Sequence, residues 1–132
     1  MAFSLAQQGY IIITGGGPGA MEAANHGAHD AGGMSIGINI TLPRLRTKET
    51  ANGYVDEKYL CKYFFARKTL LSFAAHVYIF VPGGFGTLDE MFEMLTLVQT
   101  KKIPSIPIIL KGRAYYAGLM EWLRGTVYRG HK

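Results

Sequence analysis

The residues best suited to chemistry lie in one stretch, Pro82-Gly-Gly-Phe-Gly-Thr87, between an apolar run and an amphipathic pattern. Apolar residues recur at three- and four-residue spacing from Phe85 to Val98, which predicts a helix with one buried face. The first N–H groups of such a helix lack internal partners, and the helix dipole favours negative charge there. Glycines leave room for an anion, and Thr87 adds a hydroxyl. The stretch therefore predicts an anion site.

Glu90 is unusual beside a phosphate cradle, because a carboxylate close to an anion raises the electrostatic energy. It lies three residues after Thr87 and hence on the same face of the predicted helix. One interpretation is a capping box, with Thr87 as the N-cap residue and Glu90 at the third helical position, worth roughly 1 kcal/mol. The other is a catalytic carboxylate facing a bound ligand. The two interpretations are compatible, and the sequence leaves both open.

Three further charged residues have a structural and a functional interpretation. Arg67 lies among apolar neighbours on a predicted helix over 62–75, and arginine is seldom buried unless it is paired. Its partner is either a structural carboxylate or a phosphate and Glu90, and we favour the second. Lys68 is predicted to be a charge at the rim of the site. Glu22 falls in the first turn of a predicted helix, where the dipole alone favours a carboxylate.

Another glycine loop lies earlier in the chain and is called the first glycine loop below: Gly15-Gly-Gly-Pro-Gly-Ala20 follows a strand pattern and formally fits the dinucleotide fingerprint G-x-G-x-x-G/A. That fingerprint also requires an acidic residue at the end of the next strand, to hold the ribose. The next strand ends in Asn39-Ile40-Thr41, so a dinucleotide site is disfavoured. A Walker A lysine is also absent from the sequence. This loop is expected to form either a second polar wall of the ligand site or a tight turn.

The remaining pattern alternates strands and helices, which predicts a Rossmann-like α/β fold with a doubly wound parallel sheet. The 132 residues are expected to form a single nucleotide-binding domain, 1–132. Because the pattern begins with a helix remnant, we expect the domain to be part of a longer parent domain whose terminal elements are missing here. The expected elements are a helix over 1–8 closed by Gly9, a strand over 10–14 buried on both faces, a helix over 20–31, a strand over 34–40, a surface loop over 43–57, a helix over 62–75, strands over 77–81 and 108–110, and a helix over 115–123.

Composition narrows the classes of partner and compartment. The net charge of +5 favours an anionic partner over a cationic one. The single cysteine, Cys61, excludes an internal disulfide and is interpreted as a packing residue in a reducing compartment. No long apolar run or signal-peptide pattern is present, so a cytoplasmic location without membrane attachment is expected. The four histidines show no ligand spacing, so neither a metal nor another cofactor is expected.

Three segments together closely resemble the LONELY GUY family of cytokinin-activating phosphoribohydrolases, also catalogued as "possible lysine decarboxylase". The segments are Gly15 to Asn25, Phe65-Ala-Arg-Lys68 and Pro82-Gly-Gly-Phe-Gly-Thr-Leu-Asp-Glu90. The resemblance covers nearly the whole chain and implies hydrolysis of the N-glycosidic bond of a nucleoside 5′-monophosphate, such as AMP or a cytokinin riboside monophosphate. It also implies a homodimer or a larger homo-oligomer. The decarboxylase description has no physical support, since nothing resembles a pyridoxal phosphate lysine.

By the same resemblance, Arg67 and Glu90 are the catalytic residues. The resemblance also implies that four residues of the later glycine loop hold the 5′-phosphate: Gly83, Gly84, Gly86 and Thr87. We further expect substrate contacts from the earlier loop and from two charged residues: Gly16, Gly17, Glu22 and Lys68.

Two other functions remain as alternatives. One is a non-catalytic carrier of a phosphate-bearing ligand, similar to molybdenum-cofactor carrier proteins. The other is binding of single-stranded DNA, which the basic charge allows. DNA binding is disfavoured, because the sequence lacks an aromatic stacking stripe.

Overall fold

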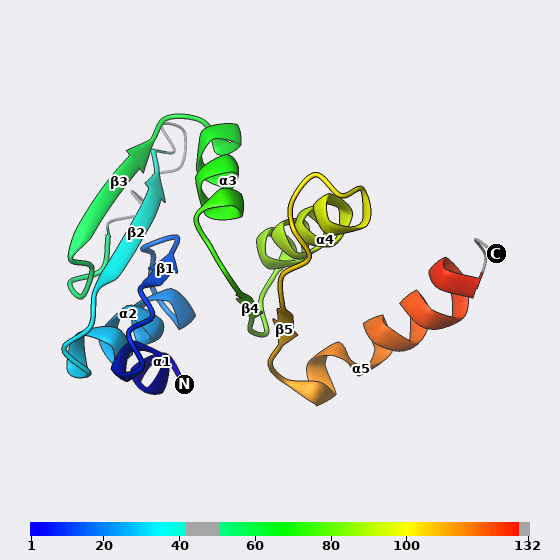
Figure 1. Ribbon diagram of the computed structural model, residues 1–132, viewed down its shortest axis with the longest axis horizontal. Coiled ribbons are helices and arrows are strands. Elements are labelled where there is room, and N and C mark those ends of the chain that lie inside the picture. Colours follow the sequence, from blue (N-terminus) through cyan, green and yellow to red (C-terminus); the bar gives the residue numbers. More distant parts are fainter. Residues whose placement is uncertain (42–50, 130–132) are drawn as a thin grey trace. The chain divides into compact units, whose positions relative to one another are not determined.

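The structure is a computed structural model that describes residues 1–41 and 51–129. It divides into two compact units, Met1–Ala75 and His76–Lys132, and Figure 1 shows the elements of each. Residues 43–50 of the expected 43–57 loop lie outside the described residues. The prediction of a single domain over 1–132 stays a prediction.

The first unit holds a three-stranded parallel sheet in the order β1-β2-β3. Helices α1 and α2 pack on each other and against β1, whereas α3 packs against β2 and β3 (Figure 1). Thr14 pairs with Gly37, and Asn39 pairs with Leu60, so the carboxyl ends of the strands lie together. The elements are α1 (Ala2–Gln7), β1 (Ile12–Thr14), α2 (Ala20–Asp30), β2 (Ser35–Ile40), β3 (Glu57–Cys61) and α3 (Phe64–Phe73).

Small residues allow α2 to approach α1 closely, as the alanine- and glycine-rich sequence predicts. A methyl group added at Gly27 would lie 3.2 Å from the backbone nitrogen of Phe3. A methyl added at Gly33, just beyond α2, would lie 2.8 Å from the Cβ of Ala6. Close backbone approach of this kind requires glycine at both positions. The predicted helix over 1–8 is also confirmed, and Gly9 follows it with a φ of +88°.

The sequence-based prediction misses strand β3. It places a surface loop up to residue 57 and a helix from residue 62, with no strand between them. Four of the five residues of β3 are exposed, and only Cys61 is buried. Its residues therefore lack the apolar pattern of a buried strand, and only pairing with β2 reveals it. The segment just before it is also more buried than a surface loop, because Asn52 and Val55 are 8% and 7% exposed.

Strand β1 departs from its prediction in a second way. Its residues are half-buried, and Tyr10 and Ile11, which precede it, are exposed. The prediction that residues 10–14 are buried on both faces is therefore wrong for the described structure. The apolar run suggests burial on both faces, but among the described residues β1 pairs with β2 alone and lies at one end of its sheet.

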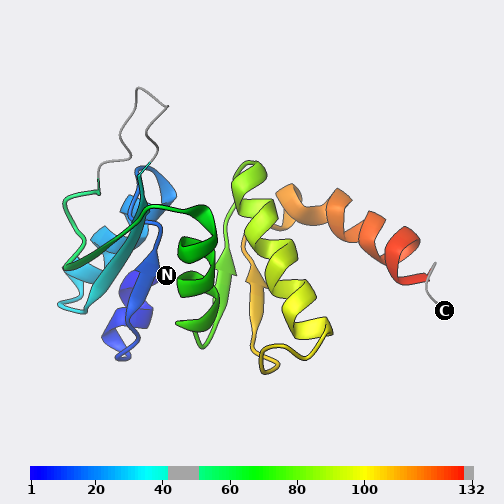
Figure 2. The ribbon, with the colours of Figure 1, turned by 90° about the horizontal axis from the view of Figure 1, so that it is seen from above.

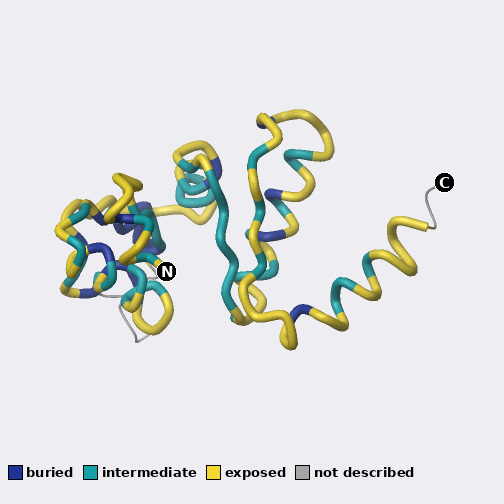
Figure 3. Tube along the Cα trace, turned by 60° about the horizontal axis from the view of Figure 1, so that its bottom comes forward, coloured by how far each residue is buried: buried dark blue, intermediate teal, exposed yellow. Residues whose placement is uncertain are grey.

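The second unit contains two parallel strands with α4 between them in sequence. Tyr78 pairs with Ile108 and Phe80 with Leu110, and α4 runs beside the strands (Figure 2). Among the described residues of this unit, four are buried: Met91 and Met94 on α4, Ile103 in the connection to β5, and Tyr116 on α5 (Figure 3). The elements are β4 (Tyr78–Phe80), α4 (Phe85–Gln99), β5 (Ile108–Leu110), α5 (Arg113–Trp122) and the π-helical turn η1 (Leu123–Tyr128).

Helices and parallel strands thus alternate along the chain, which confirms the predicted Rossmann-like α/β class. The described residues contain five strands rather than the four expected, because β3 was missed. Across 1–41 and 51–129, no helix is both long enough and apolar enough to span a bilayer.

Candidate functional site

The predicted anion loop leads directly into the longest helix, α4. Gly84 is the N-cap residue, in an extended conformation with φ −90° and ψ −158°, and the helix begins at Phe85. The carbonyl of Gly84 accepts hydrogen bonds from the N–H groups of Thr87, at 3.1 Å, and Leu88, at 3.2 Å. The amides of Phe85 and Gly86 are thus the first of the helix, where intrahelical partners do not exist.

Of the two interpretations of Glu90, the capping box is wrong. Thr87 occupies the third helical position, and the N-cap residue is Gly84, which has no side chain. The Thr87 side chain instead lies against Gly83, because a methyl group added at Gly83 would collide with the Thr87 hydroxyl. Glu90 consequently lies in the second turn of α4 rather than at its third position, so capping does not explain the carboxylate.

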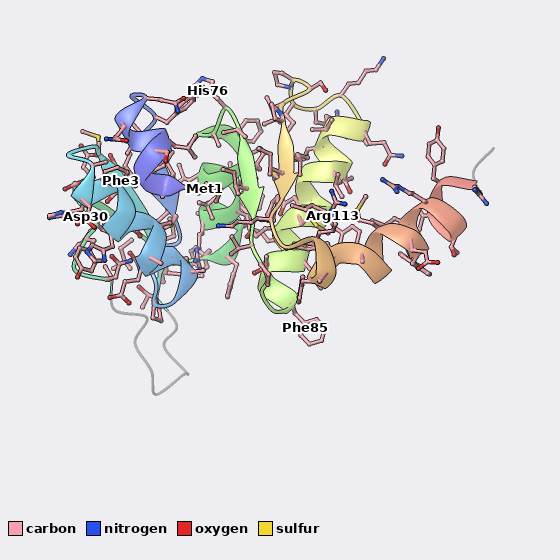
Figure 4. The ribbon with its side chains drawn as sticks, turned by 90° about the horizontal axis from the view of Figure 1, so that it is seen from below. Met1, Phe3, Asp30, His76, Phe85 and Arg113 are labelled. Atoms are coloured by element: carbon pink, nitrogen blue, oxygen red, sulfur yellow. The ribbon has the colours of Figure 1, made fainter. Side chains whose placement is uncertain are left out.

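The start of α4 is open to solvent. Gly84, Phe85 and Gly86 are exposed, and Figure 4 shows the Phe85 side chain projecting outward from the first turn. A methyl group added at Gly84 or Gly86 would have no heavy atom within 4 Å. The backbone amides here are therefore accessible to an anion, and the helix dipole favours negative charge at the same place.

Residues of helix α5 form hydrogen bonds to the loop that precedes α4. The hydroxyl of Tyr116 donates a hydrogen bond to the carbonyl of Val81 at 2.8 Å, and the hydroxyl of Tyr115 donates one to the carbonyl of Gly83. Gly112, which precedes α5, has a φ of +107°, and a methyl added there would lie 2.9 Å from the Pro82 ring. The loop is thus fixed by contacts that the sequence does not reveal.

Glu90 is half-buried in the second turn of α4. Its charge acts on Tyr78 in β4: burial raises the pKa of the Tyr78 hydroxyl, and the Glu90 carboxylate raises it further. The Glu90 carboxylate is therefore placed so that its charge affects the pKa of Tyr78, the first residue of β4.

Arg67 lies in the first unit, in α3, and its guanidinium lies against the first glycine loop. A methyl group added at Gly15 would collide with the guanidinium and would lie 2.8 Å from the sulfur of Met21. Gly15 is therefore required to be glycine by the side chains that fill its space. The half-buried position of Arg67 agrees with the sequence pattern, which places it among apolar neighbours.

Asn52 is a residue that sequence reasoning missed. Its side-chain amide donates hydrogen bonds to the carbonyls of Gly16, at 3.2 Å, and Gly17, at 3.0 Å, and to Oδ1 of Asn25 at 2.9 Å. Its backbone N–H also donates to the Gly16 carbonyl, at 2.8 Å. The hydroxyl of Thr14 accepts from the Gly16 N–H at 2.9 Å and donates to Asn25 at 2.8 Å. The first glycine loop is therefore held by a buried polar network.

The other predicted substrate-binding residues of the first unit differ in how far they are buried. Gly16 and Gly17 are buried, and a methyl added at Gly16 would lie 2.5 Å from Oδ1 of Asn39 at the end of β2. Glu22 is half-buried in the first turn of α2, and Lys68 is half-buried one position after Arg67. No substrate is needed to explain the packing of Gly16, whereas Glu22 and Lys68 keep their predicted roles as proposals.

Within the described ranges, no group of histidine, cysteine and acidic side chains has the arrangement of a metal site. Cys61 is buried at the end of β3, in agreement with its interpretation as a packing residue. His26 pairs with Asp30 at 3.3 Å and stacks on Tyr54, with ring centroids 4.0 Å apart.

The alternating helices and parallel strands define a Rossmann-like α/β protein, and the start of α4 exposes backbone amides at a glycine loop. Residues 21–131 match the family described as "Possible lysine decarboxylase", and the chain belongs to that family. The chain is 30% identical over 97% of its length to the cytokinin riboside 5′-monophosphate phosphoribohydrolase of Mycobacterium tuberculosis, of which it covers 68%. The predicted resemblance to the LONELY GUY family is thereby confirmed.

Solved structures share the fold. The molybdenum cofactor carrier protein of Chlamydomonas reinhardtii superposes with a TM-score of 0.62 and 28% identity, over 83% of this chain and 60% of that one. The molybdenum cofactor binding protein of Rippkaea orientalis superposes with a TM-score of 0.68 and 23% identity, over 93% and 71% of the two chains. The second likeness supports the fold alone.

Proposed function

We propose that this protein hydrolyses the N-glycosidic bond of nucleoside 5′-monophosphates, releasing a free base and ribose 5-phosphate. The shared family and the phosphoribohydrolase name of its mycobacterial relative support this reaction. The single observation that carries it is the juxtaposition in α4 of open first-turn amides and a carboxylate one turn later. The amides suit a phosphate, and the carboxylate suits a sugar attached to it.

The proposed mechanism follows from the charge that develops during the reaction. Glycosidic cleavage passes through an oxocarbenium-like sugar, so the enzyme must stabilise positive charge at the anomeric carbon and supply a water molecule. The amides of Gly84 and Gly86 and the hydroxyl of Thr87 bind the 5′-phosphate and fix the ribose. Glu90 then stabilises the cation or orients the water. Gly83 contributes by leaving space for the Thr87 hydroxyl.

Among the residues of the first unit, Arg67 enters the proposal through the family resemblance, and the others through their place in the sequence pattern. Arg67 is proposed as the second catalytic residue, and Lys68, Glu22, Gly16 and Gly17 as substrate-binding residues. The contact of Arg67 with Gly15 supports a fixed guanidinium, since its position is determined by the loop against which it packs. Each role is tested by its own substitution.

The decisive test is Glu90→Gln, assayed by release of adenine from AMP. The substitution keeps the shape of the side chain and removes its charge, so we expect turnover to fall about 10²- to 10³-fold, as for loss of a preorganised electrostatic group. The melting temperature should change little. Asp89→Asn, an exposed neighbour on the same helix, is the matched control and should retain turnover. Full turnover by Glu90→Gln with unchanged stability would reject the proposal.

A carrier function is the second candidate, favoured by the 28% identity to the Chlamydomonas carrier protein. A carrier would bind a phosphate-bearing ligand at the same open amides without turnover. Incubation with a panel of nucleoside monophosphates separates the two, because only the hydrolase releases free base. Tight binding without release of any base would favour the carrier.

The remaining proposals concern context. We propose a cytoplasmic protein that forms a homodimer or a larger homo-oligomer. The cytokinin riboside monophosphate named for the relatives is proposed as one substrate of the AMP type. Light scattering of the purified protein tests the oligomer, and comparison of AMP with isopentenyladenosine monophosphate tests the preference.

A further inference from the structure

The peptide group between Gly83 and Gly84 is oriented by helix α5. The hydroxyl of Tyr115 donates a hydrogen bond to the carbonyl of Gly83, across 32 positions of sequence. No peptide bond of the described residues is cis. In a trans peptide the carbonyl and the following N–H point in opposite directions. A Gly83 carbonyl held toward Tyr115 therefore directs the Gly84 N–H to the opposite side of the loop.

A contact from elsewhere in the chain is needed to fix the orientation of this peptide group, because glycine lies on both sides of it. Without a Cβ on either residue, both orientations of the peptide plane are sterically accessible. Gly84 is exposed, and a methyl added there meets no atom within 4 Å, so packing around it does not select one orientation. The Tyr115 hydroxyl supplies the missing constraint.

We propose that Tyr115 is a positioning residue that holds the Gly84 N–H in its phosphate-binding orientation. The inference rests on the proposed function, since it assumes that the phosphate of the substrate binds at the start of α4. It assigns to an exposed tyrosine of α5 a role in substrate affinity, although Tyr115 itself does not contact the substrate.

The neighbouring Tyr116 provides a matched contrast within the same helix. Its hydroxyl donates to the Val81 carbonyl at 2.8 Å, and the residue that follows Val81 is Pro82, which has no N–H. The Tyr116 hydrogen bond therefore orients no donor toward a ligand. Tyr116 is 2% exposed whereas Tyr115 is 47% exposed, so loss of the Tyr116 hydroxyl should affect stability more.

The experiment compares Tyr115→Phe and Tyr116→Phe in the full chain. For each variant, the Kd for ribose 5-phosphate is measured by calorimetry, KM and kcat for AMP by adenine release, and the melting temperature by circular dichroism. For Tyr115→Phe we expect both Kd and KM to rise about tenfold or more, as for one hydrogen bond to a charged group, with an unchanged melting temperature and a smaller change in kcat. For Tyr116→Phe we expect a lower melting temperature and a Kd within about twofold of the wild type.

The outcomes separate this inference from the proposed function. Wild-type binding of ribose 5-phosphate without AMP turnover would overturn the hydrolase and leave the Kd comparison intact. Wild-type turnover with equal Kd values for Tyr115→Phe and the wild type would overturn the positioning role alone. Equal losses of affinity in the two variants would also overturn it, since they would indicate a general structural effect. A wild type that neither binds ribose 5-phosphate nor releases adenine would overturn both.

Discussion

The two glycine loops look alike in sequence but differ in what surrounds them. In the loop from Gly15 to Gly19, the space beside Gly15 and Gly16 is filled by Arg67, Met21 and Asn39, and the backbone is held by Asn52. In the loop from Gly83 to Gly86, the space beside Gly84 and Gly86 is empty. Glycine is therefore required at Gly15 and Gly16 by side chains distant in sequence, and at Gly83 by Thr87, whereas Gly84 and Gly86 leave the backbone open to a ligand.

This difference separates two effects of substitution. A change in the first loop should destabilise the fold, because buried atoms occupy the space that a new side chain needs. A change at Gly84 or Gly86 should reduce ligand affinity and spare the fold. The following predictions test that separation.

The largest loss of stability is expected for Asn52→Ala. The substitution removes three contacts donated by the side-chain amide and one accepted from the Tyr54 N–H, and it leaves the buried carbonyls of Gly16 and Gly17 with fewer donors. We expect the free energy of unfolding to fall by about 2–4 kcal/mol. Urea denaturation measures it, and Asn52→Asp is the companion variant, which keeps the size but loses the donors. A change below about 0.5 kcal/mol for Asn52→Ala would show that the network does not hold the first loop.

Gly15→Ala should destabilise the protein less and also reduce turnover. The added methyl displaces the Arg67 guanidinium or the Met21 side chain, and such overpacking costs about 1–3 kcal/mol. Because Arg67 is proposed as catalytic, its displacement should also lower kcat for AMP. Gly19→Ala is unsuited as a control because Gly19 has a φ of +73°. Gly53→Ala, with no atom within 4 Å, serves instead. Wild-type stability of Gly15→Ala would contradict the packing of Arg67 on this loop.

Gly86→Ala should have opposite effects on stability and on affinity. Gly86 lies in the first turn of α4 in open space, and alanine is favoured over glycine in a helix by up to about 1 kcal/mol. We expect a slightly higher melting temperature together with a higher KM for AMP, because the methyl obstructs the approach of the phosphate. An unchanged KM would place the phosphate elsewhere, and the comparison of the two loops would then lose its functional meaning.

The smallest effect is expected from alkaline pH. Burial raises the pKa of Tyr78 above its ordinary 10.0, with a further contribution from Glu90. The folded state therefore favours the neutral hydroxyl more than the unfolded chain does. This contribution to stability is complete below about pH 10 and is lost as the pH rises through the higher folded pKa. Ultraviolet titration of tyrosine should show a lower Tyr78 pKa in Glu90→Gln, with Tyr78→Phe identifying the signal. An unshifted titration would mean that Glu90 lies too far from Tyr78 to influence it.

Short-range pattern predicts much of this molecule. The helix over 85–99, the helix over 20–30 and the strand over 35–40 follow from spacing, alanine content and glycine boundaries, all of which act within a few residues. The exposed strand β3 and the buried Asn52 do not, because pairing and burial depend on neighbours distant in sequence.

The sequence by itself determined the class of fold, the family, the two glycine loops and the position of Glu90 after the second of them. Only the tertiary structure decided that the first loop is filled and the second is open. The residues that fill or fix the loops, Arg67, Asn52 and Tyr115, lie tens of residues away along the chain. Local sequence cannot specify such contacts, because they form only when helices and strands pack together.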